Sequence, residues 1–466
     1  MNREPPGPSG HGPLQDWGGD LGAFLPFALF LVGVMVLGLS GAPVETGFWP
    51  VLLAALMLGL LLSRNRSAYS EVILAGMSRP LVMVLVMAWL LAGVLGTLLA
   101  ESGLVPALVW LGRATSVSGG GYVAAAFLIT GLVATATGTS LGTILVCAPM
   151  LYPSGPGMGA DPAWLMGAII GGATFGDNVS PVSDTTIASA NTQGADMGGV
   201  VRSRMRYALP AASLALIAFS VWGGGPVSPD RLPVGEGQAG PGGLVMLLVP
   251  ALVIVLLIRR RHLVEGLMMG ILAAVVLGLI TRQFTPGDLF FLDREAYSAS
   301  GLLLRGMERG VGVSIFTILL MGLVAGLEGA GLVDRMVRTA TGGATTAGQA
   351  ERRIFATVSA AVILTTHAAV AILAVGEITR EVGKRFGISG YRRSNLLDVT
   401  VCTYPFLFPF FIPTILAASM TAGMEGFGAP HLSAWTVGLH NVHSWALLLV
   451  ILFAVGTGWG RGDPAG

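Results

Sequence analysis

Apolar runs of about 20 residues recur along the whole chain, separated by short polar or basic stretches. A run of this length crosses the hydrocarbon core of a bilayer as a helix. We therefore expect six apolar segments, a linker rich in Gly and Pro, and six further segments. The segments lie at 23–40, 47–63, 79–100, 121–151, 163–190, 206–222, 244–258, 263–280, 311–328, 353–378, 394–418 and 441–458.

These segments predict two membrane repeats, at 23–222 and 244–458, joined by the linker at 223–243. Residues 1–22 are polar and lack the basic start, short apolar core and cleavage site of a signal peptide. We expect a disordered tail there and a second tail at 459–466.

Two short matches in one register indicate that the halves are related. Residues 101–105 (ESGLV) recur as 329–333 (GAGLV), and 137–140 (TGTS) align with 365–368 (TTHA), both at an offset of 228. Two matches at one offset favour an internal duplication.

Arginine positions predict the topology, because short cytoplasmic loops retain Lys and Arg. Basic residues at 64–79 place the second loop and the N-terminus in the cytoplasm. Arg202, Arg204 and Arg206 then mark the loop after the fifth segment as cytoplasmic, which simple alternation does not allow.

A re-entrant hairpin at 121–151 removes this conflict, and basic residues on both sides of 353–378 require a second hairpin. The loop at 152–162 contains no Lys or Arg and then faces outward. The chain is thus predicted to be an all-α polytopic membrane protein of two inverted repeats, with re-entrant hairpins and broken helices.

The fifth segment is interrupted by the sequence GDNVSPVSDTT at 176–186. Pro181 has no amide hydrogen and would break a helix, and Ser183 or Asp184 would cap a second half-helix. Asp177 would lie at the negative end of the first half-helix, a position that calls for a bound cation or a proton. The alternative is a surface loop in which Ser and Asp only cap helices; Asp196 is expected at the interface.

Hydroxyl-rich tips are predicted for both hairpins. In the first, Thr137, Thr139 and Ser140 would offer oxygens to a hard cation such as sodium, unless they bond back to their own helix. In the second, Thr366 and His367 occupy the tip. His367 is either a proton sensor or a packed, hydrogen-bonded histidine.

The eleventh segment contains Asp398 and is expected to break at Pro405, Pro409 and Pro413. Asp398 is either a site carboxylate or an interfacial partner of the basic pair at 392–393.

Other polar residues are weaker candidates. Glu101 and Glu328 could be proton-linked carboxylates near segment ends, and His440 and His443 have an i, i+3 spacing without a third metal ligand, which favours an interfacial helix start.

Composition supports a membrane domain and excludes other classes. The chain is 53% hydrophobic and 11% charged, with a net charge of +1, so it offers no basic face for nucleic acid. Cys147 and Cys402 lie in apolar segments, which argues against a disulfide framework or a thiolate metal site. No zinc-binding helix, catalytic triad spacing or phosphate-binding loop appears, so we do not expect an enzyme.

The run GATFGDNVSPVSDTT at 172–186 closely resembles the signature of NhaC-type sodium/proton antiporters, a family of the ion-transporter superfamily. Residues 137–143 are similar to its first hairpin and 393–398 to the start of its second broken helix. The second hairpin departs from the family, because His367-Ala368-Ala369 replaces a Gly-Asn-Gln type of polar tip.

The resemblance implies exchange of sodium or lithium for protons by alternating access, with no cofactor beyond the transported ions. Asp177 and Asp184 would bind sodium, with neutral oxygens from Asn178, Ser180, Ser183, Thr185 and the first hairpin. The alternative is an ion-coupled exchanger or symporter of a small organic anion or amino acid. The expected location is a bacterial inner membrane, where an apolar face meets lipid or the second protomer of a homodimer.

Overall fold

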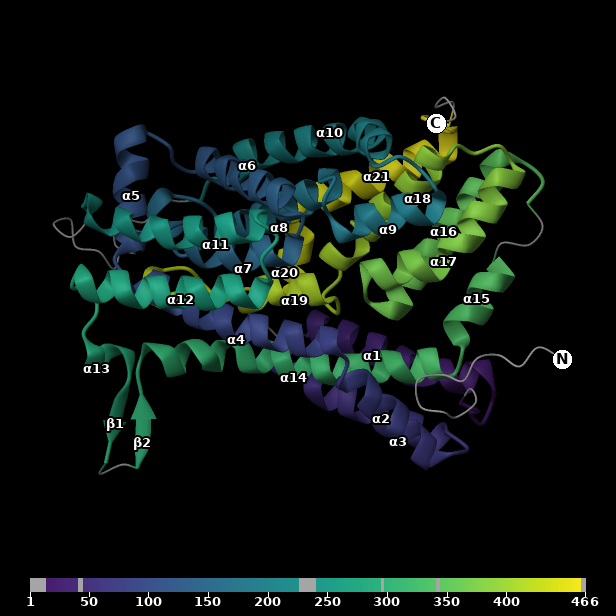
Figure 1. Cartoon of the computed structure of the whole chain (residues 1–466), viewed down its shortest axis with the longest axis horizontal. Coiled ribbons are helices and arrows are strands. Elements are labelled where there is room, and N and C mark those ends of the chain that lie inside the picture. Colours follow the sequence, from purple (N-terminus) through teal and green to yellow (C-terminus); the bar gives the residue numbers. More distant parts are fainter. Residues whose placement is uncertain (1–13, 41–44, 226–239, 295–296, 341–343, 462–466) are drawn as a thin grey trace.

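The computed structural model describes residues 14–40, 45–225, 240–294, 297–340 and 344–461. They form an elongated, almost entirely helical bundle (Figure 1). Among them, seven helices are long and apolar enough to cross a membrane, or eight if the bent pair α20–α21 counts as one span. Most of the predicted linker and most of both predicted tails lie outside the described residues.

The first half of the chain contains ten helices among its described residues. They are α1 (Asp20–Leu39), α2 (Trp49–Leu62), α3 (Arg66–Met77), α4 (Pro80–Glu101), α5 (Leu104–Thr115), α6 (Gly120–Thr137), α7 (Ser140–Leu151), α8 (Pro162–Val179), α9 (Asp184–Gln193) and α10 (Met197–Trp222).

The second half adds further helices and one small strand pair. They are α11 (Leu248–Ile258), α12 (Leu263–Ile280), α13 (Pro286–Leu289), β1 (Phe291–Asp293), β2 (Ser298–Ser300), α14 (Leu302–Gly329), α15 (Leu332–Ala340), α16 (Ala347–Thr365), α17 (Ala368–Arg385), α18 (Gly390–Val401), α19 (Ile412–Ser419), α20 (Ala434–His440) and α21 (Val442–Thr457).

Each of the twelve predicted apolar segments coincides with one helix or with two consecutive helices. The short helices α3, α5 and α15 and the antiparallel β1–β2 pair were not expected. None of these elements contains an apolar run long enough to cross a bilayer, so the hydrophobic pattern does not reveal them.

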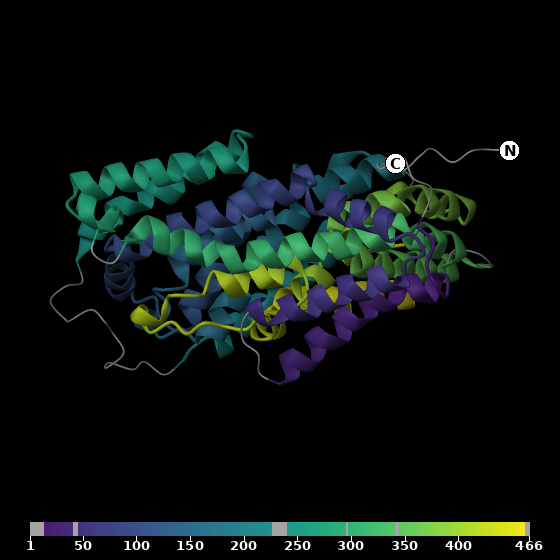
Figure 2. The same cartoon turned by 90° about the horizontal axis from the view of Figure 1, so that it is seen from below.

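The long helices α4 and α14 cross at glycines. A Cβ atom at Gly93 would lie 2.2 Å from the carbonyl oxygen of Gly306, and one at Gly310 would lie 2.8 Å from the backbone of Leu90. Small residues at such a crossing let two membrane helices approach closely and gain packing contacts. Figure 2 shows α14 running along the bundle from the turned view.

The first predicted hairpin is present. Helix α6 ends at Gly138, which adopts a left-handed φ of 70°, and α7 then runs back. The base is closed by hydrogen bonds from the Gly119 amide to the Met158 carbonyl (2.7 Å) and from the Tyr122 hydroxyl to the Leu151 carbonyl (2.9 Å). Both ends of the hairpin therefore lie at the same end of the molecule.

The second hairpin, α16–α17, has its base at the opposite end. Helix α8 begins beside the first base, where the Asp161 amide bonds to the Gly223 carbonyl at 2.9 Å. Helix α9 ends beside the second base, where Arg393 Nε donates to Gln193 Oε1 at 3.0 Å. Figure 1 shows α5–α7 toward one end and α15–α17 toward the other.

The two short sequence matches fall at equivalent places in the two halves. Helices α4 and α14 end at Glu101 and Gly329, and helices α6 and α16 end at Thr137 and Thr365, each pair at the offset of 228. The order of elements thus recurs, while the inverted-repeat relationship itself stays a prediction.

The prediction that Arg202, Arg204 and Arg206 occupy a loop is wrong. Helix α10 begins at Met197 because the Asp196 carboxylate caps it, accepting from the Gly199 amide at 2.7 Å. All three arginines are inside this helix, and Arg204 is completely buried. The evidence for the two hairpins is therefore their geometry in the structure and not the position of these three arginines.

Candidate functional site

A helix break at the centre of the bundle carries the predicted acidic sequence. Helix α8 stops at Val179 and α9 starts at Asp184, with Ser180–Ser183 between them. Pro181 lies in this break, as its missing amide hydrogen predicts. Ser183 occupies the N-cap position of α9, although its side chain makes no capping hydrogen bond.

Asp177 lies in the last turn of α8 and is almost fully buried, with 6% of its surface exposed. Its Oδ1 atom has no hydrogen-bond partner among the described residues. Ser140 and Ser183 lie close to the carboxyl group, and Asp184 and Asp398 lie within electrostatic range. A buried carboxylate in such surroundings needs a compensating proton or cation.

Asn178 is the second buried polar residue at the break. Its side chain is completely buried, and both amide atoms, Nδ2 and Oδ1, lack partners within the described part of the chain. The backbone carbonyl of Asn178, by contrast, accepts a hydrogen bond from Arg204 at 2.6 Å. Two adjacent residues therefore present unpaired side-chain oxygens inside the bundle.

The remaining residues of the break hold it in shape. The Ser180 hydroxyl donates to the Thr135 carbonyl at 2.8 Å and accepts from the Val182 amide at 3.3 Å. The hydroxyls of Ser183 and Thr185 lie 3.0 Å apart. The Ser180 bond joins the break to α6, and the other two contacts are local to the break and the start of α9.

Asp184 differs from Asp177, although the resemblance implies that both bind sodium. Asp184 is exposed, and its Oδ1 atom accepts from the Thr185 amide at 2.8 Å.

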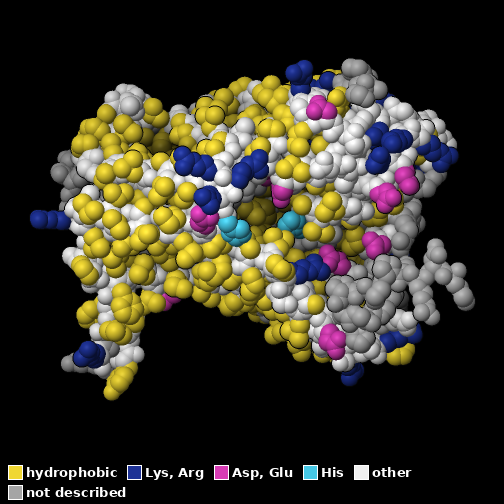
Figure 3. Space-filling model, viewed as in Figure 1, with side chains coloured by type: hydrophobic (Ala, Val, Ile, Leu, Met, Phe, Trp, Pro, Cys, Tyr) yellow, Lys and Arg dark blue, Asp and Glu magenta, His cyan; other side chains and the backbone are white. Residues whose placement is uncertain are grey.

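Figure 3 shows a hollow near the middle of one face, between the ends of α11 and α12 and the region of α9 and α17. Acidic, basic and histidine side chains surround this hollow.

At the tip of the first hairpin, two of the three predicted hydroxyls bond back to the local backbone. The Thr137 hydroxyl donates to the Val133 carbonyl at 2.8 Å, and the Thr139 hydroxyl caps α7 by accepting from the Gly142 amide at 3.2 Å. Ser140 is buried and lies beside Asp177. Of the three, Ser140 is therefore the residue that lies near the Asp177 carboxyl group.

The second hairpin tip contains unsatisfied polar atoms. Thr366 has a left-handed φ of 52° and ends α16, and His367 occupies the N-cap position of α17. The Thr366 hydroxyl and His367 Nδ1 have no hydrogen-bond partner among the residues described. Asp184 lies within electrostatic range of His367, so the tip lies near the start of α9.

Asp398 is completely buried on α18, and its ionic partner is Arg204 of α10. The alternative of an interfacial partnership with the basic pair at 392–393 is wrong. Arg392 pairs with buried Glu351 at 3.0 Å, and Arg393 bonds to Gln193. Helix α18 ends at Val401 and α19 starts only at Ile412, so the break expected around the prolines is present.

Arg204 is the main residue of this cluster that the sequence analysis missed. Besides Asp398, it donates to the Thr186 hydroxyl at 2.7 Å and from Nε to Asn395 Oδ1 at 3.0 Å. The cap residue Asp196 was the available signal, because a helix starting at Met197 places Arg204 two turns inside a helix and not in a loop.

The weaker candidates lie outside this cluster. Glu328 pairs with Arg79, Glu101 lies 3.8 Å from Arg305, and Asp196 caps α10. His443 is completely buried in the first turn of α21, so the expected helix start is present. No group of three His, Cys, Asp or Glu side chains that could hold a metal occurs in the described ranges.

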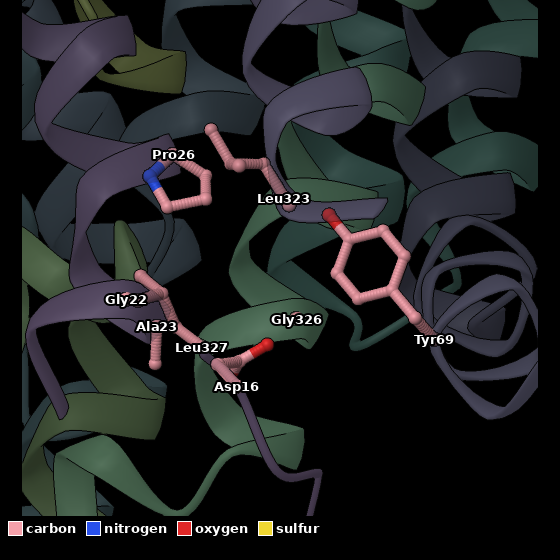
Figure 4. A pocket seen from close by; sticks show the side chains of 9 residues that line it. Asp16, Gly22, Ala23, Pro26, Tyr69, Leu323, Gly326 and Leu327 are labelled. Carbon is pink, nitrogen blue, oxygen red and sulfur yellow. The ribbon is translucent and has the colours of Figure 1, made fainter. Parts of the chain in front are cut away.

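A small pocket between the N-terminal segment, α1, α3 and α14 contains none of the predicted site residues. Asp16, Pro26 and Tyr69 are among its lining residues (Figure 4). Partial burial raises the pKa of the Asp16 carboxyl above its usual value. This pocket belongs to the packing of the N-terminal helices and is separate from the helix breaks.

A helical membrane bundle with two hairpins and a buried carboxylate at a helix break defines a polytopic membrane transporter. Residues 22–224 match the model of the Na+/H+ antiporter family. The resemblance to NhaC-type sodium/proton antiporters that the motifs predicted is confirmed by this match and by the similarity to NhaC proteins.

Similar curated proteins include antiporters with different substrates. The chain is 27% identical to the malate-2H(+)/Na(+)-lactate antiporter of Bacillus subtilis, over 68% of this chain and 70% of the relative. It is 26% identical to the Na(+)/H(+) antiporter NhaC of Alkalihalophilus pseudofirmus, over 54% of this chain and 57% of the relative. The match thus spans little more than half the length of that NhaC relative.

Among solved structures, the YdaH transporter of Alcanivorax borkumensis is similar with a TM-score of 0.37 and 16% identity, over 87% of this chain and 91% of that one.

Proposed function

We propose that this chain exchanges sodium or lithium for protons by alternating access, with Asp177 as the shared binding group. The observation that carries the proposal is the unpaired, buried Asp177 Oδ1 at the break of α8. A bound cation or a proton would remove the cost of burying this carboxylate, and only one of them can occupy it at a time. That competition couples the two fluxes.

The neighbouring groups suit a small hard cation, which takes oxygen ligands. Asp177 Oδ1 and Asn178 Oδ1 are unpaired, and the Ser140 and Ser183 hydroxyls lie beside the carboxyl. We assign these four side chains to the sodium site. Asp184 is exposed, so it would attract the cation from solution toward the site and would not be one of its ligands.

Exchange of a small organic anion or amino acid is the second candidate. Relatives named as a malate-2H(+)/Na(+)-lactate antiporter and an arginine/ornithine antiporter support it. So do the unpaired Thr366 hydroxyl and His367 Nδ1 at the start of α17, where a helix N-terminus favours a carboxylate.

Proton flux in proteoliposomes that contain only inorganic salts separates the two candidates. We expect external sodium or lithium to move protons in the opposite direction. If neither ion moves protons, the sodium/proton proposal fails, and malate, lactate and amino acids become the substrates to test.

We also propose a bacterial inner-membrane location with a cytoplasmic N-terminus, and the charge pattern supports this orientation. Asp20 at the start of α1 pairs with Arg335 at 2.6 Å, so the N-terminal helix starts near the second hairpin. Basic residues gather at the base of the second hairpin, which includes Lys384 and Arg385, and the loop at 152–162 has none. The lipid-facing surface would also accommodate a second protomer in a homodimer.

A further inference from the structure

Two buried carboxylates lie near the ends of the two broken helices, in opposite environments. Asp177 is in the last turn of α8, and Asp398 is in the last turn of α18. Asp177 Oδ1 has no hydrogen-bond partner among the described residues. Asp398 forms an ion pair with Arg204 and accepts from the Thr186 hydroxyl at 3.1 Å.

Arg204 reaches from α10 into a space lined by oxygen atoms. Its Nη1 atom donates to the Asn178 carbonyl at 2.6 Å and to the Thr186 hydroxyl at 2.7 Å, and it pairs with Asp398. The Nε atom donates to Asn395 Oδ1 at 3.0 Å. The arginine is therefore surrounded by a carbonyl, a hydroxyl, a carboxylate and an amide oxygen.

This is the set of oxygen ligands that a hard metal cation takes in proteins. The Asn178 carbonyl lies at the C-terminal end of α8, where carbonyls lack helical partners and the helix dipole favours a positive charge. The side chains of Arg204 and Asp398 are both completely buried, so bulk water does not solvate these oxygens and the guanidinium provides the positive charge. An arginine carries a fixed charge and donors of fixed geometry.

We propose that Arg204 is a tethered cation, which permanently fills the half of the ion site formed by Asp398 and Thr186. Only the half at Asp177 then exchanges sodium and protons. Asp398 is the counter-ion of Arg204 and not a ligand of the transported ion. Arg204 is a positioning residue. Its hydrogen bond to the Asn178 carbonyl fixes the backbone beside Asp177 whether or not an ion is bound. The assignment of exchange to Asp177 rests on the proposed function.

Removing the arginine charge should open a second cation site. The test is thermal unfolding of the purified full chain in detergent, with NaCl replaced stepwise by choline chloride at constant ionic strength. Each bound ion adds a stabilisation that grows with its concentration. We expect the Tm of Arg204→Gln to rise with NaCl about twice as steeply as that of the parent. Arg202→Gln removes the same charge from an exposed position on the same helix and should follow the parent.

Equal sodium dependence in Arg204→Gln and the parent would overturn the tethered-cation proposal. The double variant Arg204→Gln with Asp398→Asn removes both charges and should return to the parental slope. It also covers the case in which Arg204→Gln alone does not fold. If the Tm of the double variant rises with NaCl less steeply than that of the parent, Asp398 binds the exchanged sodium. This result too contradicts the proposal.

The proposed function has a separate outcome in the same experiment. A parent whose Tm does not respond to NaCl contradicts sodium binding at Asp177. In that case, a sodium response gained only in Arg204→Gln still supports the tethered cation, and its absence overturns it.

Discussion

The hydroxyl of Ser180 donates a hydrogen bond of 2.8 Å to the backbone carbonyl of Thr135 and so joins the break of α8 to the last turn of α6. The two helices also pack closely, since a Cβ atom at Gly176 would lie 2.2 Å from the Gly131 carbonyl oxygen. The first hairpin and the acidic break therefore form one unit, which places Ser140 beside Asp177.

Asp177→Asn should abolish sodium-dependent proton movement while the protein still folds. The amide has the shape of the carboxyl group but neither carries the charge nor exchanges a proton near neutral pH. The measurement is proton flux in proteoliposomes after a sodium pulse. Asp196→Asn, at an exposed helix cap, is the matched control and should retain flux. Flux of parental size in Asp177→Asn would show that the exchange site lies elsewhere.

Ser140→Ala should raise the sodium KM about five-fold, since one lost ligand or hydrogen bond is worth about 1 kcal/mol. The maximal rate should change less, because Asp177 remains. Thr137→Val is the comparison, since that hydroxyl bonds to the Val133 carbonyl and not to the site. Measured sodium KM values that rise equally in both variants would contradict the placement of Ser140.

Glu351→Gln should destabilise the protein by about 3–5 kcal/mol, the usual cost of removing one partner of a buried ion pair. Glu351 and Arg392 are completely buried, and Arg461 also pairs with this carboxylate at 2.9 Å. The measurement is thermal or denaturant unfolding in detergent. Glu381→Gln removes a carboxylate from an exposed position and should change little.

Single cysteines at the two hairpin bases should react with impermeant reagents from opposite sides of the membrane. Gly121 has open space around it, and Lys384 is exposed near the end of α17. We expect Lys384→Cys to label from the cytoplasm and Gly121→Cys from outside. The native Cys147 and Cys402 are buried and provide a low background. Labelling of both positions from one side would rule out the opposed hairpins.

Asp16→Asn should raise the Tm slightly at pH 7. Burial raises the pKa of the Asp16 carboxyl in the folded protein, so the folded state holds this proton more tightly than the unfolded state. The contribution of Asp16 to stability is then greatest at low pH. It falls as the pH rises from the pKa of Asp16 in the unfolded chain through its higher pKa in the folded protein. The gain from Asp16→Asn should therefore disappear below about pH 4. Asp20→Asn, which breaks an ion pair with Arg335, should lower the Tm instead.

Much of the helical framework and part of the site could be predicted from the sequence. The broken fifth segment and the break near Pro405 follow from local features: an apolar run and a proline without an amide hydrogen. The hairpins were inferred from arginine placement, of which the part that used Arg202, Arg204 and Arg206 was wrong. The roles of the individual hydroxyls could not be predicted. Thr137, Thr139 and Ser140 are adjacent and chemically alike, yet only Ser140 lies beside Asp177.

The sequence by itself determined that the chain is a membrane bundle with an acidic helix break, because the length of an apolar run and the chemistry of a helix breaker act locally. Only the tertiary structure decided which charges compensate one another. The sequence indicated a loop position for Arg204 and left Asp398 as either a site carboxylate or a partner of its basic neighbours, but folding buries the two residues together. In a medium without water a charge is stabilised by whichever group lies next to it in space, so the partner does not follow from proximity in the sequence.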